Sequence, residues 1–165
     1  MMDMLEAMEA LNESSAYYYI DYIPHNPTSS AYLELEAYYE KTYLPVFADK
    51  ISRMMLQLMW EYPCRACLGE MGKQIDKYAH ITPFTDIRQC APEQLADIIK
   101  TVIQQDFTLF SILFSDVKAL VTIGGGFQVV LYQPSDKMVA FTKQLCQAEG
   151  LFLKYKAEDG NRILV

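Results

Sequence analysis

The chain has 165 residues, a hydrophobic content of 52% and a formal net charge of −7. This hydrophobic content suffices for a packed core and the length fits one ordinary domain, so global disorder is not expected. The negative charge disfavours sequence-independent binding to DNA, RNA or anionic membrane surfaces, because their phosphate groups would be repelled.

The first part of the chain, residues 1–62, is predicted to be mainly helical, acidic and rich in tyrosine. Apolar residues at helical spacing predict a helix over 1–11. The aromatic segment 16–23 is typical of a strand, and helices are expected over 31–43 and 45–61. The last of these helices should bury Phe47, Ile51, Met54, Met55 and Leu58. The apolar stripe of the first helix could also pack on a second copy of the chain, so a homodimer is one alternative. That stripe includes Met4, Leu5, Met8 and Leu11.

Residues 64–90 carry the weakest pattern in the chain. Gly69 and Gly72 interrupt regular structure, and a short helix is expected over 73–80 before an irregular loop. The two cysteines that begin this segment are expected at the junction between a helix and a loop.

Residues 91–165 are predicted to form a helix and a sheet. The best amphipathic helix begins at Pro92 and should bury Leu95, Ile98, Ile99, Val102 and Ile103. Strands are expected over 107–114, 119–123, 127–133, 151–156 and 162–165, with a helix over 136–149. The order strand-strand-strand-helix-strand-strand predicts an α+β fold in which N-terminal helices pack on a C-terminal, mainly antiparallel sheet. We expect the whole chain to form a single α+β domain.

The negative charge is concentrated at the start of the chain. The first forty residues contain eight carboxylates and no Lys or Arg, together with seven tyrosines. A surface of this kind attracts basic partners, and its rings can anchor an interface. The candidate partner-binding residues are Tyr18, Asp21, Tyr22, Glu34, Glu36, Tyr38 and Glu40.

This pattern favours a non-enzymatic module that docks on a basic protein. An immunity or inhibitor protein acting against a nucleic-acid-acting protein would have such a charge distribution. The simpler interpretation is that these carboxylates only solubilise an exposed helix face, with the tyrosine rings half-buried at the boundary.

Cysteine spacing offers a second hypothesis. Cys64 and Cys67 form a CxxC pair, which would suit a redox-responsive or small-molecule sensor domain. The same pair could bind zinc together with His80 and Cys90, but a second CxxC or an HxxxH motif, which would make the pattern specific, is missing. No cofactor is therefore expected.

No motif specifies a reaction. The segment Gly124–Gly126 matches neither standard phosphate-binding fingerprint and is followed by a predicted strand, so it indicates a hairpin turn. Neither His25 nor His80 has a neighbour in sequence that indicates a catalytic triad. Because no reaction motif is found, we expect a non-enzymatic protein. The acidic N-terminus also lacks the basic and apolar regions of a secretory signal, so we expect the protein to be cytoplasmic and without a membrane anchor.

Overall fold

The computed structural model describes residues 3–165, and in that range the strands form one seven-stranded antiparallel sheet. The helices are α1 (Met4–Asn12), α2 (Tyr32–Thr42), α3 (Leu44–Glu61), α4 (Pro92–Gln105) and α5 (Asp136–Glu149). The strands are β1 (Tyr17–Asp21), β2 (Cys64–Leu68), β3 (Phe110–Phe114), β4 (Ala119–Ile123), β5 (Val129–Tyr132), β6 (Phe152–Lys156) and β7 (Arg162–Leu164). The strand order is β2-β3-β4-β5-β1-β6-β7. The predicted α+β class, with helices packed on an antiparallel sheet, is confirmed.

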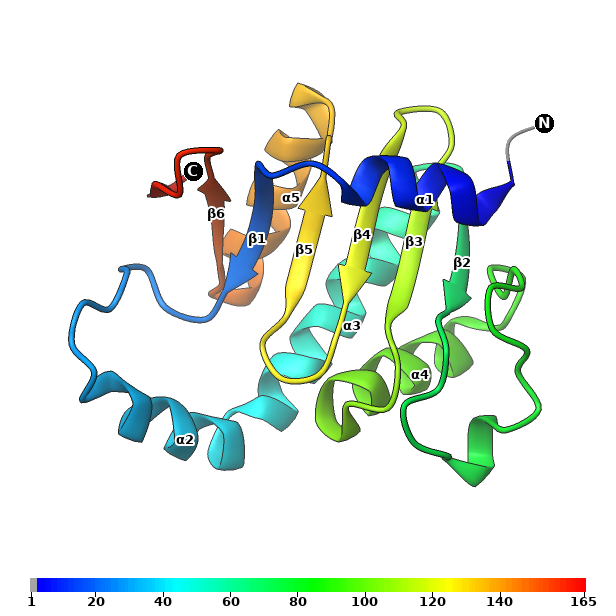
Figure 1. Cartoon of the computed structure of the whole chain (residues 1–165), viewed down its shortest axis with the longest axis horizontal. Coiled ribbons are helices and arrows are strands. Elements are labelled where there is room, and N and C mark those ends of the chain that lie inside the picture. The colour runs from blue at the N-terminus through cyan, green and yellow to red at the C-terminus, as the bar shows by residue number, and fades with distance from the viewer. Residues whose placement is uncertain (1–2) are drawn as a thin grey trace.

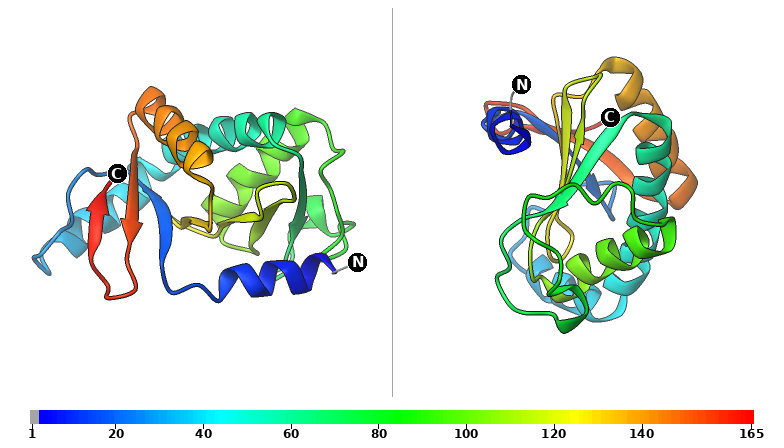
Figure 2. Two further views of the ribbon diagram at one scale, coloured as in Figure 1. Left: turned by 90° about the horizontal axis from the view of Figure 1, so that it is seen from above. Right: turned by 90° about the vertical axis from the view of Figure 1, so that its right-hand side faces the viewer.

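The helices lie on both faces of the sheet (Figure 1, Figure 2). One face is covered by α3, α4 and α5, and the opposite face carries α1. The main core lies between the sheet and the first group of helices. The predicted buried faces of α3 and α4 are confirmed, because each of their predicted residues is at most 3% exposed. Helical periodicity alone was sufficient for these two elements.

The order of strands differs from the order expected for a sheet made of C-terminal segments. Strand β1 lies between β5 and β6, where Tyr19 pairs with Val130 on one side and with Lys154 on the other. The helix α5 connects β5 to β6 and leaves room between them for this N-terminal strand. Residues near the start of the chain therefore occupy the interior of the sheet.

The prediction for residues 64–90 was wrong at residues 64–68 and only partly right at residues 73–80. Residues 64–68 form strand β2, which pairs along its length with β3, instead of a junction between helix and loop. The short helix expected over residues 73–80 is reduced to a 3-10 helix of three residues, Asp76–Tyr78. Tyr78 anchors this turn by stacking on Phe107 at 5.8 Å between ring centroids. Both errors have one cause: long-range packing determines these segments, and their local sequence has little periodicity.

Helix α1 packs on its own chain through a second, smaller core. Met4 and Met8 are buried against Cys67, Leu113 and Leu120 on the face of the sheet opposite the main core. From the sequence, one alternative was that this apolar stripe packs on a second copy of the chain. Two of its residues are instead buried within the protomer, so the stripe is not the exposed surface that the homodimer alternative requires.

The glycine loop between β4 and β5 is a turn, as predicted, and it is also a packing site. The Gly126 backbone N–H donates to the carbonyl of Ile103 at the end of α4 (2.9 Å). A Cβ atom on Gly125 would lie 2.2 Å from the Cβ of Asp106. Only glycine permits this close approach between the loop and the helix terminus.

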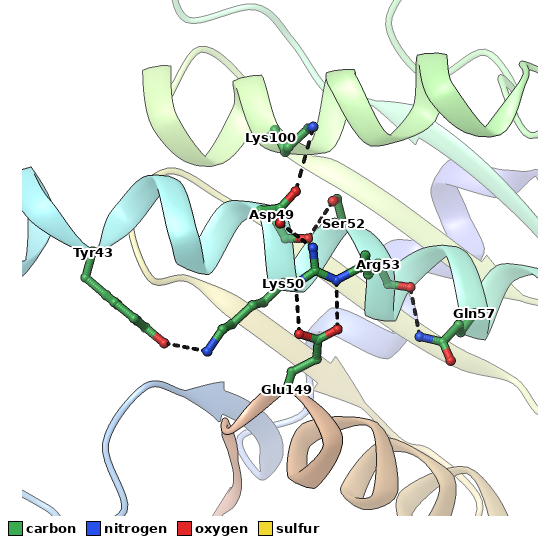
Figure 3. A network of polar contacts seen from close by, with 8 residues as sticks. All are labelled: Tyr43, Asp49, Lys50, Ser52, Arg53, Gln57, Lys100 and Glu149. Carbon is green, nitrogen blue, oxygen red and sulfur yellow. Dashed lines mark hydrogen bonds and ion pairs between the residues drawn. The ribbon is translucent and has the colours of Figure 1, made fainter.

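A polar network ties α3 to α5 on the outer surface of the helix layer (Figure 3). Arg53 donates two hydrogen bonds to the Glu149 carboxylate, each 2.9 Å long, and also pairs with Asp49 one turn earlier in α3. The hydrogen bonds from Arg53 hold the pKa of Glu149 below its usual value. Arg53 is half exposed, so solvent screens the pair and its contribution to stability is small.

This network predicts a measurable effect of pH on stability. Because the folded-state pKa of Glu149 is depressed, its contribution is present above the unfolded pKa of about 4.3 and is lost as pH falls through the folded value. Glu149→Gln should therefore reduce the loss of stability on acidification from pH 6 to pH 3, measured by urea unfolding. The control is Glu158→Gln, an exposed carboxylate in the β6–β7 turn. A decline as steep in Glu149→Gln as in wild type would contradict the prediction.

Candidate functional site

Helix α2 differs from the other α-helices of the described residues 3–165 in its weak packing on the body of the protein. None of its residues is buried, and in Figure 1 it lies beyond the ends of the strands, where it leads directly into the start of α3. Its exposed side chains include large apolar ones: Leu33 is 67% exposed, Tyr38 58% and Leu35 42%. Apolar groups of this size on an otherwise polar helix are typical of a contact surface.

An aromatic cluster holds α2 in place. It consists of Tyr22, Tyr39, Tyr43, Phe47 and Phe127. Tyr22 stacks on Phe127 with 4.2 Å between ring centroids, and Tyr39 meets Tyr22 edge-on at 5.4 Å. Phe47, fully buried in α3, meets Phe127 at 5.0 Å and links the cluster to the main core. Burial raises the pKa of Tyr22 well above its usual value, so its hydroxyl stays protonated.

A polar pocket of about 420 Å³ lies between α2, the loop that precedes it and the end of β1. Asp21, Tyr22 and Glu36 line it, so three of the predicted partner-binding residues come together here. Tyr32 and Arg162 also line the pocket, and the Tyr32 hydroxyl donates to that of Tyr22 at 3.4 Å. The pocket can accept a polar or cationic group.

The Asp21 carboxylate has its own partners inside the fold. It accepts hydrogen bonds from Lys154 Nζ and from the Tyr22 backbone N–H, both at 2.7 Å. Lys154 is 1% exposed and also donates to the His25 carbonyl at 2.7 Å. This carboxylate therefore neutralises a buried cation, which leaves Glu36 as the carboxylate in the pocket without an ion pair among the described residues.

The remaining predicted residues lie at different places. Glu34, Tyr38 and Glu40 are exposed on α2. Helical spacing puts Glu34 and Tyr38 on one side and Glu40 on another. Tyr18 lies on the face of the sheet that packs against the main core, and the centroid of its ring is 4.8 Å from that of Tyr155. It is half-buried and away from α2.

The acidic N-terminal segment does not form one continuous surface. Its first carboxylates lie on α1, on the face of the sheet opposite the main core, whereas Glu34, Glu36 and Glu40 lie on α2 (Figure 1, Figure 2). Only the α2 group stands beside exposed apolar side chains. We define the α2 surface as the exposed side chains of Leu33, Glu34, Leu35, Tyr38 and Glu40, which extend around more than one side of the helix.

The positions of Cys64 and Cys67 do not suit a redox-active dithiol pair. Residues three apart on a strand point to opposite faces of the sheet, and Cys64 packs in the main core whereas Cys67 packs under α1. Burial raises the pKa of both thiols, that of Cys67 to about 11. A reactive thiol needs the opposite shift.

The proposed zinc ligands do not gather either. His80 and Cys90 line a pocket of about 520 Å³ between the 76–90 loop and α4, which neither Cys64 nor Cys67 lines. In the range 3–165 no group of three or more His, Cys, Asp or Glu side chains is placed to hold a metal ion.

The site also contains residues that sequence patterns did not single out. Leu33, Leu35, Tyr32, Phe127 and Arg162 belong to the α2 surface, the pocket or the aromatic cluster. For the residues of α2, the sequence contained one indication of exposure. Leu33, Leu35 and Tyr38 are spaced by two and three residues, so they do not form a single apolar stripe that a helix could bury. Phe127 and Arg162 are distant in sequence and gave no such signal.

None of the helices in the described part of the chain is both long and apolar enough to traverse a bilayer. Comparison with protein-family models, with curated proteins and with solved structures gave no match to this chain.

Proposed function

We propose that this protein is a non-enzymatic binding module whose α2 surface docks on a basic partner protein. The observation that carries the proposal is the exposure of Leu33 and Tyr38 on a helix with no buried residue, beside the carboxylates Glu34 and Glu40. Apolar and aromatic groups at the centre of an interface supply contact energy, and carboxylates around them supply steering and specificity. An inhibitor or immunity protein that covers a basic surface of a nucleic-acid-acting protein would need both apolar contact groups and carboxylates around them.

The polar pocket supports the same proposal. A lysine or arginine side chain of the partner would enter beside Glu36, with the rings of Tyr22 and Tyr32 available for cation–π contact. The setting we propose is the cytoplasm, where thiols stay reduced, in keeping with four cysteines that form no disulfide.

The test is a pull-down from the native host with three tagged proteins. The α2 variant carries Glu34→Lys, Glu36→Lys and Glu40→Lys. The matched control carries Glu6→Lys, Glu9→Lys and Glu13→Lys, three exposed positions in or just after α1. Both variants change the net charge equally, so a difference between them reports location rather than total charge.

We expect one basic protein to be retained by wild type and by the α1 variant, to elute at moderate salt, and to be lost from the α2 variant. Circular dichroism should show that all three proteins are folded. Tyr38→Ala should weaken binding of the same protein at least tenfold if the ring is an interface anchor. Equal retention by all three proteins, or equal loss from both variants, would refute a specific α2 surface.

A further inference from the structure

A third cavity lies on the face of the sheet opposite the main core, under the C-terminal half of α1. It has a volume of about 440 Å³, within the range of small-molecule sites. Its apolar wall is made by Ala7 and Leu11 of α1 and by Leu113 of β3. Met8 is buried against the sheet and so holds α1 in place. The side chains of Ala7 and Ala10 are too small to fill the cavity between the helix and the sheet.

Two cations stand at this apolar cavity. Arg65 of β2 lies directly across from Leu113 in the strand register, and Lys118 ends the turn between β3 and β4, in a left-handed conformation with φ of 50°. Both line the cavity. No ion pair in the range 3–165 involves either of them. Both cations are therefore available to an anion that enters this apolar cavity.

An apolar wall next to two cations suits a ligand that has both an apolar chain and a negative charge. An alkyl chain would bury its surface against α1 and β3, and a carboxylate would accept charge-assisted hydrogen bonds from the two cations. Asp116 is exposed in the same turn as Lys118, so the local positive charge is modest and a monoanion fits better than a phosphate dianion. We propose that this cavity binds a free medium-chain fatty acid, with its carboxylate between Arg65 and Lys118.

The charge around the cavity favours a free acid over a lipid in a bilayer. Glu6 and Glu9 are exposed on α1, the helix that forms one wall of the cavity, and an anionic membrane would approach them as well as the two cations. Their repulsion would oppose binding at a membrane surface. This site lies on α1 and the sheet, and it is independent of the α2 surface.

The first experiment is calorimetric titration of the full chain with octanoate and decanoate below their micelle concentrations. Burial of each added CH₂ group should tighten the dissociation constant about fourfold, so decanoate should bind about 15-fold more tightly than octanoate. Decanol, which has the same chain without the charge, should bind at least tenfold more weakly than decanoate.

Two variants test the two halves of the site. Arg65→Gln with Lys118→Gln should weaken decanoate binding at least tenfold, whereas Lys137→Gln with Lys143→Gln, on α5 at the other face of the sheet, should not change it. Ala7→Phe fills the cavity and keeps both cations, so it should abolish binding. Melting temperatures identify any variant that does not fold, and amide NMR shifts at Ala7 and Leu113 on adding decanoate locate the site in wild type.

Three outcomes would overturn the proposal: no saturable binding of decanoate below its micelle concentration, equal weakening by the α5 control, or an affinity that does not change with chain length. Binding only to vesicles containing anionic lipid, with none to the free acids, would also overturn it, because the ligand would then be a membrane surface.

Discussion

Replacing Asp21 with alanine should destabilise the protein by about 3–5 kcal/mol, a large fraction of the stability of a domain of this size. The change removes the carboxylate that lies 2.7 Å from Lys154 Nζ. Lys154 would keep only the His25 carbonyl and would hold an uncompensated charge in a position that is 1% exposed. The effect follows from desolvation of that cation rather than from the strength of the ion pair itself.

The double variant Asp21→Ala with Lys154→Met provides the control. It removes both charges and replaces the lysine with an apolar side chain of similar length, so it should be markedly more stable than Asp21→Ala alone. Urea unfolding of wild type, both single variants and the double variant gives the coupling free energy. Additive single effects would contradict the interpretation, because a buried pair must show strong coupling.

Replacing Phe47 with alanine should cost about 3–5 kcal/mol and should also loosen α2. Phe47 is fully buried, and its ring contacts Phe127, on which Tyr22 stacks. The change therefore opens a cavity in the core and removes the support of the aromatic cluster. Urea unfolding measures the first effect, and hydrogen exchange of the α2 amides in the native state measures the second.

Phe110→Ala is the matched control, because Phe110 is equally buried but lies in the sheet outside the aromatic cluster. Both variants should lose similar stability. Only Phe47→Ala should accelerate exchange in α2 relative to exchange in α5. Equal acceleration in the two variants would show that α2 is held by global stability alone, without a specific anchor.

These two predictions separate structural from functional roles among the residues that sequence analysis grouped together. Asp21 and Tyr22 were candidates for partner binding, and the structure shows contacts that hold the fold for both. Loss of binding in their variants would therefore be ambiguous. Glu34, Tyr38 and Glu40 are exposed, and together with Glu36 they are the residues that the proposed binding experiment changes.

Several elements could be predicted because their causes are local. Helix α4 follows from an apolar period of 3.6 residues behind Pro92. Helix α5 begins where the Ser135 hydroxyl accepts a hydrogen bond from Met138 N–H (3.2 Å), and it ends at Gly150 with φ of 69°. Capping and periodicity depend on residues within a few positions of one another, so a single sequence contains the information.

Other features depend on contacts between distant residues. Strand β2 exists because β3 pairs with it, and its own residues have little strand preference. The sequence by itself determined the fold class, the main helices and the excess of negative charge at the start of the chain. Only the tertiary structure decided that this charge is divided between α1 and α2, that Cys64 and Cys67 face opposite cores, and that Asp21 meets a lysine 133 residues away. The reason is physical: strand pairing and burial join segments whose separation in sequence carries no local signal.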